Sequence, residues 1–251
     1  MLAMHSPEAG QQQTHRLHLQ SGDVAGVKDP GTQGMDYNVG GGVWGHPGSY
    51  FAPYLQPELE APEGEYLTDR LTSEAIGVMD DFSKQDQPWL LYMSYYTVHG
   101  PLHSKPEKTT KYAEKARQAK VKLKSPAYAG MVESLDENVG RLLDWIDEKG
   151  LRKDTIIIFT SDNGGMVRAT ENHPLRSYKG DIYEGGIRVP CIIDWPGVIQ
   201  PGAVSDTPVH GVDFFATLLA MAELPQQPEN HQDSINLVPL LKGDMDFERG
   251  P

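Results

Sequence analysis

Two adjacent oxygen donors, Asp162 and Asn163, stand where a strongly apolar segment of this chain ends. Residues 156–159 are β-branched and aromatic, which is typical of a strand buried on both faces of a parallel sheet. Ligands collect beyond the carboxyl ends of such strands, and a hard cation such as Ca²⁺ or Mg²⁺ prefers carboxylate and amide oxygens. The Asp-Asn-Gly sequence is also common turn chemistry, so a plain turn is the alternative.

Cationic side chains follow this pair. Lys179 precedes a glycine-rich segment, 180–186, and Arg188 stands at the start of another apolar stretch, 189–195. Cations beside a metal site indicate an anionic substrate whose charge must be held. We interpret Lys179 as a substrate contact and Arg188 as a residue that braces the loop.

A histidine follows a second apolar segment. Residues 89–95 predict another buried strand, and His99 comes shortly after it. A lone histidine at such a place is more often structural than functional. Because His99 follows a strand end, as Asp162 does, a role in the site is favoured.

Periodic apolar positions predict the helices that position these residues. Residues 67–83 carry apolar side chains at helical spacing. A second helix begins at Ser125, which acts as N-cap before a first-turn proline, and closes at Gly150.

The second helix connects the two predicted strands. Strand 89–95, this helix and strand 155–160 form one βαβ unit, which is expected to be right-handed. Both strands then point the same way, so His99 and Asp162 are expected at the same edge of the sheet.

The rest of the chain gives weaker signals. Strand 189–195 contains Cys191 between apolar neighbours, so we expect a buried, inert thiol. Asp213 is expected to cap a helix that runs to about residue 223, and residues 236–242 read as a short surface segment.

Composition limits the class of protein. The 251 residues can bury one sizeable core. Twenty-two Lys and Arg against 35 Asp and Glu give a net charge of −13, which argues against general nucleic-acid binding. No apolar run is long enough for a membrane-spanning helix. Basic residues gather in 105–124, where a solvated helix face is favoured over the alternative, attraction of a polyanionic substrate.

Five segments together resemble the type I sulfatases of the alkaline-phosphatase superfamily. The first reads Phe-Thr-Ser-Asp-Asn-Gly-Gly and the second Tyr-Lys-Gly-Asp-Ile-Tyr-Glu-Gly-Gly-Ile-Arg-Val-Pro. They are long and stand in the family's order, so the match is specific. The five are residues 159–165, 178–190, 195–202, 212–219 and 236–243.

The resemblance implies a fold and a reaction. The fold is an incomplete three-layer α/β sandwich with a mainly parallel sheet, and the reaction is metal-assisted hydrolysis of a sulfate ester. Asp162 and Asn163 would bind Ca²⁺ or Mg²⁺. His99 and Lys179 would contact the sulfate, and either could protonate the leaving oxygen.

The resemblance also implies a role for an earlier segment. Residues 15–20 stand where the family has Gly-Lys-Trp-His-Leu-Gly. Arg16 then takes the lysine position as a substrate contact, and His18 takes the position of a catalytic histidine. Arginine there replaces a point charge with a planar fork.

The sequence departs from the family's pattern at the nucleophile. The family uses a formylglycine made from a Cys or Ser that has Pro two residues on and Arg four residues on, and no Cys or Ser here has those neighbours. The paired aspartates that precede it in the family are also missing. We therefore interpret residues 1–14 as an irregular tail and 15–251 as a partial catalytic domain, inactive alone. Its exposed sheet edge predicts self-association.

Two alternatives remain open. The chain could be a non-catalytic anion-binding fragment or pseudoenzyme. It could also derive from a phosphodiesterase or phosphonate hydrolase of the same superfamily, although Asn163 argues against this because such enzymes usually carry a histidine there.

Substrate and compartment are less defined. The resemblance implies a sulfated small molecule or polysaccharide, with the alcohol unspecified. Sulfatases are often periplasmic, secreted or lysosomal. Residues 1–14 lack the basic-then-apolar pattern of a signal peptide, so the sequence leaves the compartment open.

Overall fold

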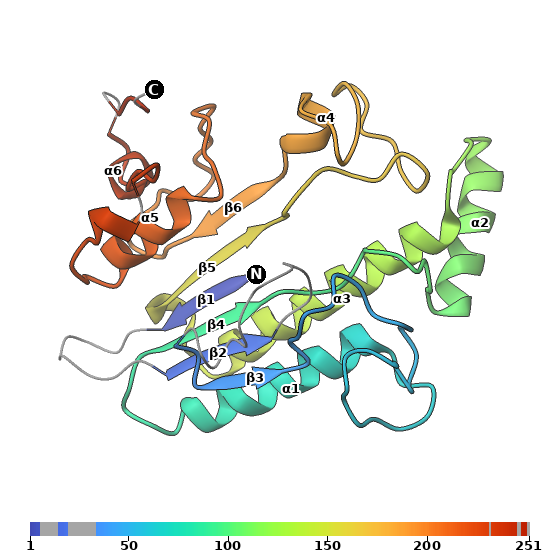
Figure 1. Ribbon diagram of the computed structural model, residues 1–251, viewed down its shortest axis with the longest axis horizontal. Helices are drawn as coiled ribbons and strands as arrows, with labels where there is room; N and C mark the ends of the chain where they lie inside the picture. Colours follow the sequence, from blue (N-terminus) through green and yellow to red (C-terminus); the bar gives the residue numbers. More distant parts are fainter. Residues whose placement is uncertain (6–14, 20–33, 231, 245–246, 250–251) are drawn as a thin grey trace. The chain divides into compact units, whose positions relative to one another are not determined.

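The computed structural model describes residues 1–5, 15–19, 34–230, 232–244 and 247–249 (Figure 1). The chain forms two compact units, residues 1–192 and residues 193–251. Every residue predicted for the site belongs to the larger unit.

The larger unit is built on a sheet with the strand order β3-β2-β4-β1-β5-β6. β2 is parallel to β3 and to β4, whereas β1 is antiparallel to β4 and to β5. β4 and β5 therefore point in the same direction with one strand between them. The strands are β1 (Leu2–His5), β2 (His15–Leu19), β3 (Tyr37–Val39), β4 (Trp89–Met93), β5 (Thr155–Thr160) and β6 (Cys191–Asp194), the last of which ends in the smaller unit.

Two amphipathic helices form where the periodicity predicts them. α1 (Leu67–Phe82) packs against β2, β4 and α3 (Pro126–Glu148) (Figure 1). The hydroxyl of Ser125 accepts a hydrogen bond from the Tyr128 N–H at 3.1 Å, and Gly150 follows the helix with φ of +69°. α1 buries its predicted stripe, which consists of Leu67, Leu71, Ala75, Met79 and Phe82.

The N-terminal segment differs from its prediction. Residues 2–5 form β1 in the middle of the sheet and are not an irregular tail, while residues 6–14 lie outside the described part. Ala3 is fully buried and is aligned with Leu91 of β4 and Ile157 of β5. Four residues are too few to show a strand period, but they satisfy backbone groups on both neighbouring strands.

β1 also bears on the predicted self-association. Because β1 pairs with both β4 and β5, no open edge lies between these two strands. The α-amino group of Met1 donates to the carbonyl oxygen of Met93 at 2.8 Å, and burial lowers its pKa to about 6. Self-association stays a prediction, but this edge no longer supports it.

Ion pairs occupy much of the basic segment. Lys108 of α2 (Pro106–Ala119) is 6% exposed, and its ammonium lies 2.5 Å from Glu137 and 3.4 Å from Glu133 of α3. Lys111 lies 2.9 Å from Glu133, and this hydrogen bond lowers the pKa of that carboxyl to about 2. These lysines dock α2 onto α3, which weakens the case for a polyanion-binding surface.

The smaller unit contains α5 (Asp213–Met221) and α6 (Val238–Leu241), which contact each other. Asp213 is buried in the first turn of α5 and is not its N-cap. Its carboxylate accepts from the backbone N–H of His210 at 2.7 Å and of Ile235 at 3.1 Å, and it pairs with Arg249. Val238 is buried, so the predicted surface segment 236–242 is wrong at its centre.

Cys191 is exposed, contrary to its predicted burial. β6 stands at the end of the strand order, so its residues are not covered by a strand on each side, and the neighbouring Ile192 is 61% exposed. Partial desolvation raises the pKa of the thiol, which keeps it protonated at neutral pH. Among the described residues, no helix combines the length and the apolar character that crossing a membrane requires.

We expect Ala3→Glu to destabilise the protein by about 3–5 kcal/mol, because it buries a carboxylate without a partner. Met4→Glu is the matched control, since Met4 is half-buried and points to the opposite face of the sheet. Urea unfolding followed by tryptophan fluorescence measures both variants. Equal, small shifts of the two midpoints would contradict the central position of β1.

Candidate active site

The two predicted metal ligands lie together at the carboxyl end of β5. Asp162 is exposed and Asn163 is half-buried, and the Asn163 amide donates to the Asp162 carboxylate. The backbone around them is held by Thr160, whose hydroxyl donates to the Pro190 carbonyl at 3.0 Å, and by Ser161, whose hydroxyl donates to the Asn163 carbonyl at 3.1 Å. The pair thus occupies a hydrogen-bonded turn, with one side chain facing the other.

Close glycine packing shapes this turn. The Gly164 N–H donates to the Gly186 carbonyl at 2.9 Å. A Cβ at Gly164 would lie 1.9 Å from the Gly185 carbonyl oxygen, and a Cβ at Gly185 would lie 2.0 Å from that of Ser177. No side chain fits at either contact. The glycines therefore fix how closely the two loops approach.

Lys179 belongs to the same arrangement. Its backbone N–H donates to the Gly165 carbonyl at 3.0 Å, two residues beyond Asn163, and its side chain is exposed. The structure thus brings the Lys179 backbone to the turn that carries Asp162 and Asn163. Arg188 pairs with Glu184 at 3.3 Å, at the C-cap of the short helix α4 (Glu184–Ile187).

Asn172 joins the two loops and was missed in the sequence. Its amide nitrogen lies 3.0 Å from the Gly165 carbonyl oxygen, 3.1 Å from that of Ser177 and 2.9 Å from that of Gly185. All three acceptors are backbone carbonyls, so no pattern of side chains marks this residue. Asn172 holds the turn that carries Asp162 and the loop that carries Lys179 in one place.

His99 follows β4 on a segment that is held by tyrosines. Its ring is exposed, and Nδ1 lies 3.1 Å from the Gly100 carbonyl oxygen. The buried Tyr50 hydroxyl donates to the carbonyl oxygens of Tyr96 at 2.7 Å and of His99 at 3.0 Å. Burial raises the pKa of Tyr50, so the phenol stays protonated and remains a donor.

Strand register places the site segments at one edge of the sheet. Through β1, Tyr92 of β4 and Ile158 of β5 lie at the same level, and Tyr92 also pairs with His18 of β2. Strands lie about 4.8 Å apart, so Tyr92 and Ile158 are separated by about 10 Å. His99 and Asp162 leave the sheet beyond this level. Among the described residues, no hydrogen bond or ion pair joins the two.

Arg16 and His18 are placed only by their backbones. Both lie on β2, where Arg16 pairs with Leu90 and His18 with Tyr92 of β4. Their side chains lie outside the described part of the structure, so their predicted contacts with substrate stay predictions.

The oxygen donors of Asp162 and Asn163 can be compared with what a bound Ca²⁺ or Mg²⁺ requires. Asp162 and Asn163 offer the oxygen ligands that Ca²⁺ and Mg²⁺ prefer, but Ca²⁺ takes six to eight oxygens. Across the described residues, no group of three His, Cys, Asp or Glu could hold an ion. These residues therefore supply part of a coordination shell and do not complete one.

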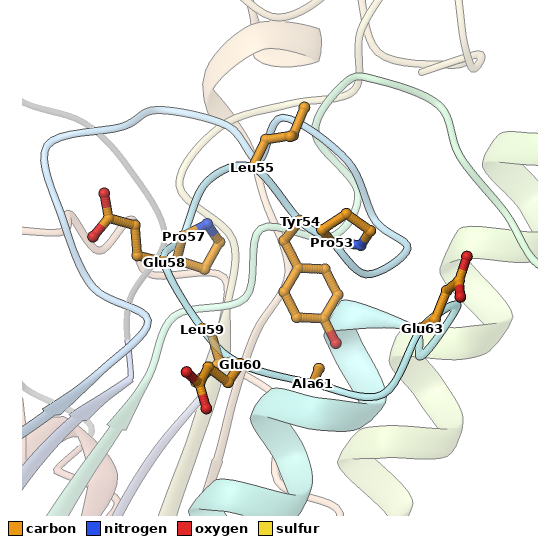
Figure 2. Close-up of a pocket in the computed structure, with 9 residues that line it drawn as sticks. All are labelled: Pro53, Tyr54, Leu55, Pro57, Glu58, Leu59, Glu60, Ala61 and Glu63. Carbon is orange, nitrogen blue, oxygen red and sulfur yellow. The ribbon is translucent and has the colours of Figure 1, made fainter.

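A cavity of about 910 Å³ lies elsewhere in the larger unit, on the loop that precedes α1 (Figure 2). Figure 2 shows Tyr54 and prolines at its wall with three carboxylates, Glu58, Glu60 and Glu63, around it. None of the predicted site residues lines it, and its carboxylates would repel a sulfate group. It is therefore not the candidate site.

Comparison with known sequences decides the family. The sequence profile of the Sulfatase family matches residues 12–224. The chain belongs to the sulfatase family. The resemblance carried by the five segments is thereby confirmed, and the candidate site belongs to a sulfatase chain.

This chain aligns with only part of the length of each individual sulfatase. A sulfatase of Formosa agariphila is 35% identical over 215 residues, which cover 77% of this chain and 39% of the relative. Human steryl-sulfatase is 36% identical over 186 residues, which cover 70% of this chain and 30% of that protein. The chain thus spans less than two fifths of these relatives.

A solved structure supports the fold. The crystal structure of Ps i-CgsB in complex with k-i-k-neocarrahexaose matches with a TM-score of 0.76 and 28% identity, covering 90% of this chain and 54% of that one. The predicted α/β fold of the sulfatases, present here in part, is confirmed.

We expect Gly164→Ala to destabilise the larger unit, because its Cβ would collide with the Gly185 backbone. Gly140→Ala is the matched control. Gly140 lies within α3 with open space around it, so alanine there should stabilise the helix by about 0.5–1 kcal/mol. Thermal unfolding measures both, and a neutral Gly164→Ala would contradict the close packing of the loops.

Proposed function

We propose that this chain carries the sulfate-binding part of a sulfatase active site. The observation that carries the proposal is the backbone bond from Lys179 to Gly165, reinforced by Asn172. This bond fixes the Lys179 backbone next to Asp162 and Asn163 at the carboxyl end of β5. The Asp162 carboxylate by itself would repel a sulfate. A cationic Lys179 beside it is expected where a metal ion and a sulfate occupy the same site.

Each residue has a distinct role in the proposal. Lys179 and His99 bind the sulfate oxygens and reduce their negative charge, together with His18. Arg16 contacts the substrate from β2. Either His99 or Lys179 donates a proton to the leaving oxygen.

This chain supplies only part of a metal coordination shell and no residue that matches the family's nucleophile. Asp162 and Asn163 would hold Ca²⁺ or Mg²⁺, which polarises the sulfate group in metal-assisted hydrolysis. The family's formylglycine has no matching Cys or Ser in the sequence. That observation favours a second candidate function for the chain by itself, anion binding without turnover.

The substrate in this proposal is a sulfated saccharide. The support is the structural match to a protein crystallised with an oligosaccharide, which covers 90% of this chain. Steryl-sulfatase is a relative of comparable identity, so a sterol sulfate is the competing class. Asn163 and the family profile speak against phosphodiester or phosphonate substrates.

We expect Lys179→Met to weaken the binding of inorganic sulfate roughly tenfold or more, since a hydrogen bond to a charged group contributes about 1.5–3 kcal/mol. Lys115→Met is the control, because Lys115 is also exposed but lies on α2. Calorimetry at low ionic strength measures both. Equal weakening in the two variants would show nonspecific attraction and reject the site.

Turnover provides a separate readout of the same proposal. The unmodified chain should release no product from an aryl sulfate above background, because removing a nucleophile costs on the order of 10⁶ in rate in a well-studied protease. Ca²⁺-dependent release that is lost in His99→Ala would refute binding without turnover. That result would not contradict the proposed sulfate-binding site.

Calcium binding should be weak, with a Kd above about 10⁻³ M, because two donors leave most of the shell to water. Calorimetry with CaCl₂ tests this, using Asp162→Ala and, as control, Asp206→Ala at an exposed position of the smaller unit. Tight stoichiometric binding that Asp162→Ala abolishes would mean that further residues complete the shell.

A further inference from the structure

A second histidine lies beside His99. The rings of His46 and His99 are nearly parallel, with 8° between their planes and 5.9 Å between their centroids. The two come from different segments, the loop after β3 and the segment after β4. Both side chains are exposed, so both rings can reach a ligand.

The protons on these rings can be assigned from their partners. Nδ1 of His46 lies 3.1 Å from the Pro47 carbonyl oxygen, and Nδ1 of His99 lies 3.1 Å from the Gly100 carbonyl oxygen. A carbonyl oxygen only accepts, so Nδ1 is the donor in each ring. In the neutral form each Nε2 then carries a lone pair and accepts a hydrogen bond.

Hydrogen bonds hold the two segments together. Tyr50, four residues after His46 and fully buried, donates to the carbonyl oxygens of Tyr96 and His99. In the other direction, the Tyr96 hydroxyl donates to the Gly40 carbonyl at 3.1 Å. The loop that carries His46 is therefore fixed on both sides to the segment that carries His99. The ring pair is positioned before any ligand binds.

We propose that His46 is a substrate contact that accepts a hydrogen bond from a saccharide hydroxyl next to the sulfate ester. This inference rests on the proposed function, in which His99 contacts the sulfate end of the substrate. A sulfate oxygen only accepts, so it pairs with the protonated form of His99, whose Nε2–H donates, whereas Nε2 of neutral His46 accepts from a hydroxyl donor. Two substituents of one sugar ring can face the two parallel rings, one at His99 and one at His46.

A hydrogen bond at His46 would give the site substrate selectivity. A saccharide presents a hydroxyl beside the esterified oxygen, whereas an aryl sulfate or a sterol sulfate presents carbon. An exposed acceptor such as His46 loses its water when a substrate covers it, and binding is weaker if the substrate offers no donor in exchange. His46 therefore favours sulfated saccharides over apolar sulfate esters without changing the affinity for sulfate itself.

The test compares three probes on the full chain at neutral pH. The probes are galactose 4-sulfate, 4-nitrophenyl sulfate and inorganic sulfate, and calorimetry gives their affinities. His46→Phe keeps a ring but removes the acceptor, and His46→Gln restores an acceptor oxygen. His103→Phe is the control, an exposed histidine four residues after His99.

His46→Phe should weaken galactose 4-sulfate about three- to tenfold, the range of one neutral hydrogen bond, and leave the other two probes unchanged. His46→Gln should recover part of that loss, and His103→Phe should change none of the affinities. Unchanged affinity for galactose 4-sulfate in His46→Phe would overturn the inference, and so would an equal loss for all three probes.

Failure of the inference and failure of the proposed function give different results. If inorganic sulfate binds in a Lys179-dependent way while His46→Phe has no effect, only the role of His46 is rejected. If sulfate binding does not depend on Lys179, the proposed function fails and this inference fails with it.

Discussion

The site depends on the close approach of two glycine-containing turns at the end of β5. Gly164 and Gly185 meet backbone to backbone, at separations that no Cβ can share. Asp162 and Lys179 can be held near each other only if their backbones are fixed, because both side chains are exposed and would otherwise adopt many conformations. Asn172 completes this constraint with hydrogen bonds to three carbonyl oxygens. The chemistry proposed for Asp162 and Lys179 follows from that packing.

A second constraint acts on the other half of the site. Tyr50 and Tyr96 are buried, and burial raises the pKa of Tyr50 and, to about 12, that of Tyr96. Both phenols therefore stay neutral and donate to backbone carbonyls across the interface between the loop after β3 and the segment after β4. This arrangement positions His99 through its backbone and brings His46 beside it. One half of the site is thus held by glycines and the other by tyrosines.

The sequence predicts the elements with strong local signals. Helices α1 and α3 follow from periodicity, and Ser125 and Gly150 mark the start and end of α3. The runs in β4 and β5 predict buried strands. β1 could not be predicted, because its four residues carry no period and its pairing joins distant parts of the chain. The exposure of Cys191 depends on which strands flank β6, and the contacts of Asn172 and His46 depend on backbone positions that local patterns do not encode.

We propose that one sulfate site lies between the loop that carries Lys179 and the segment that carries His99, beyond the ends of β4 and β5. Anomalous diffraction from crystals of the chain soaked in selenate, an analogue of sulfate, tests it most directly. We expect a selenium peak within hydrogen-bond reach of the Lys179 ammonium and the His99 ring, on the same side as Asp162. A peak confined to the exposed lysines of α2, or a separation of His99 and Asp162 too large for one anion to span, would contradict it.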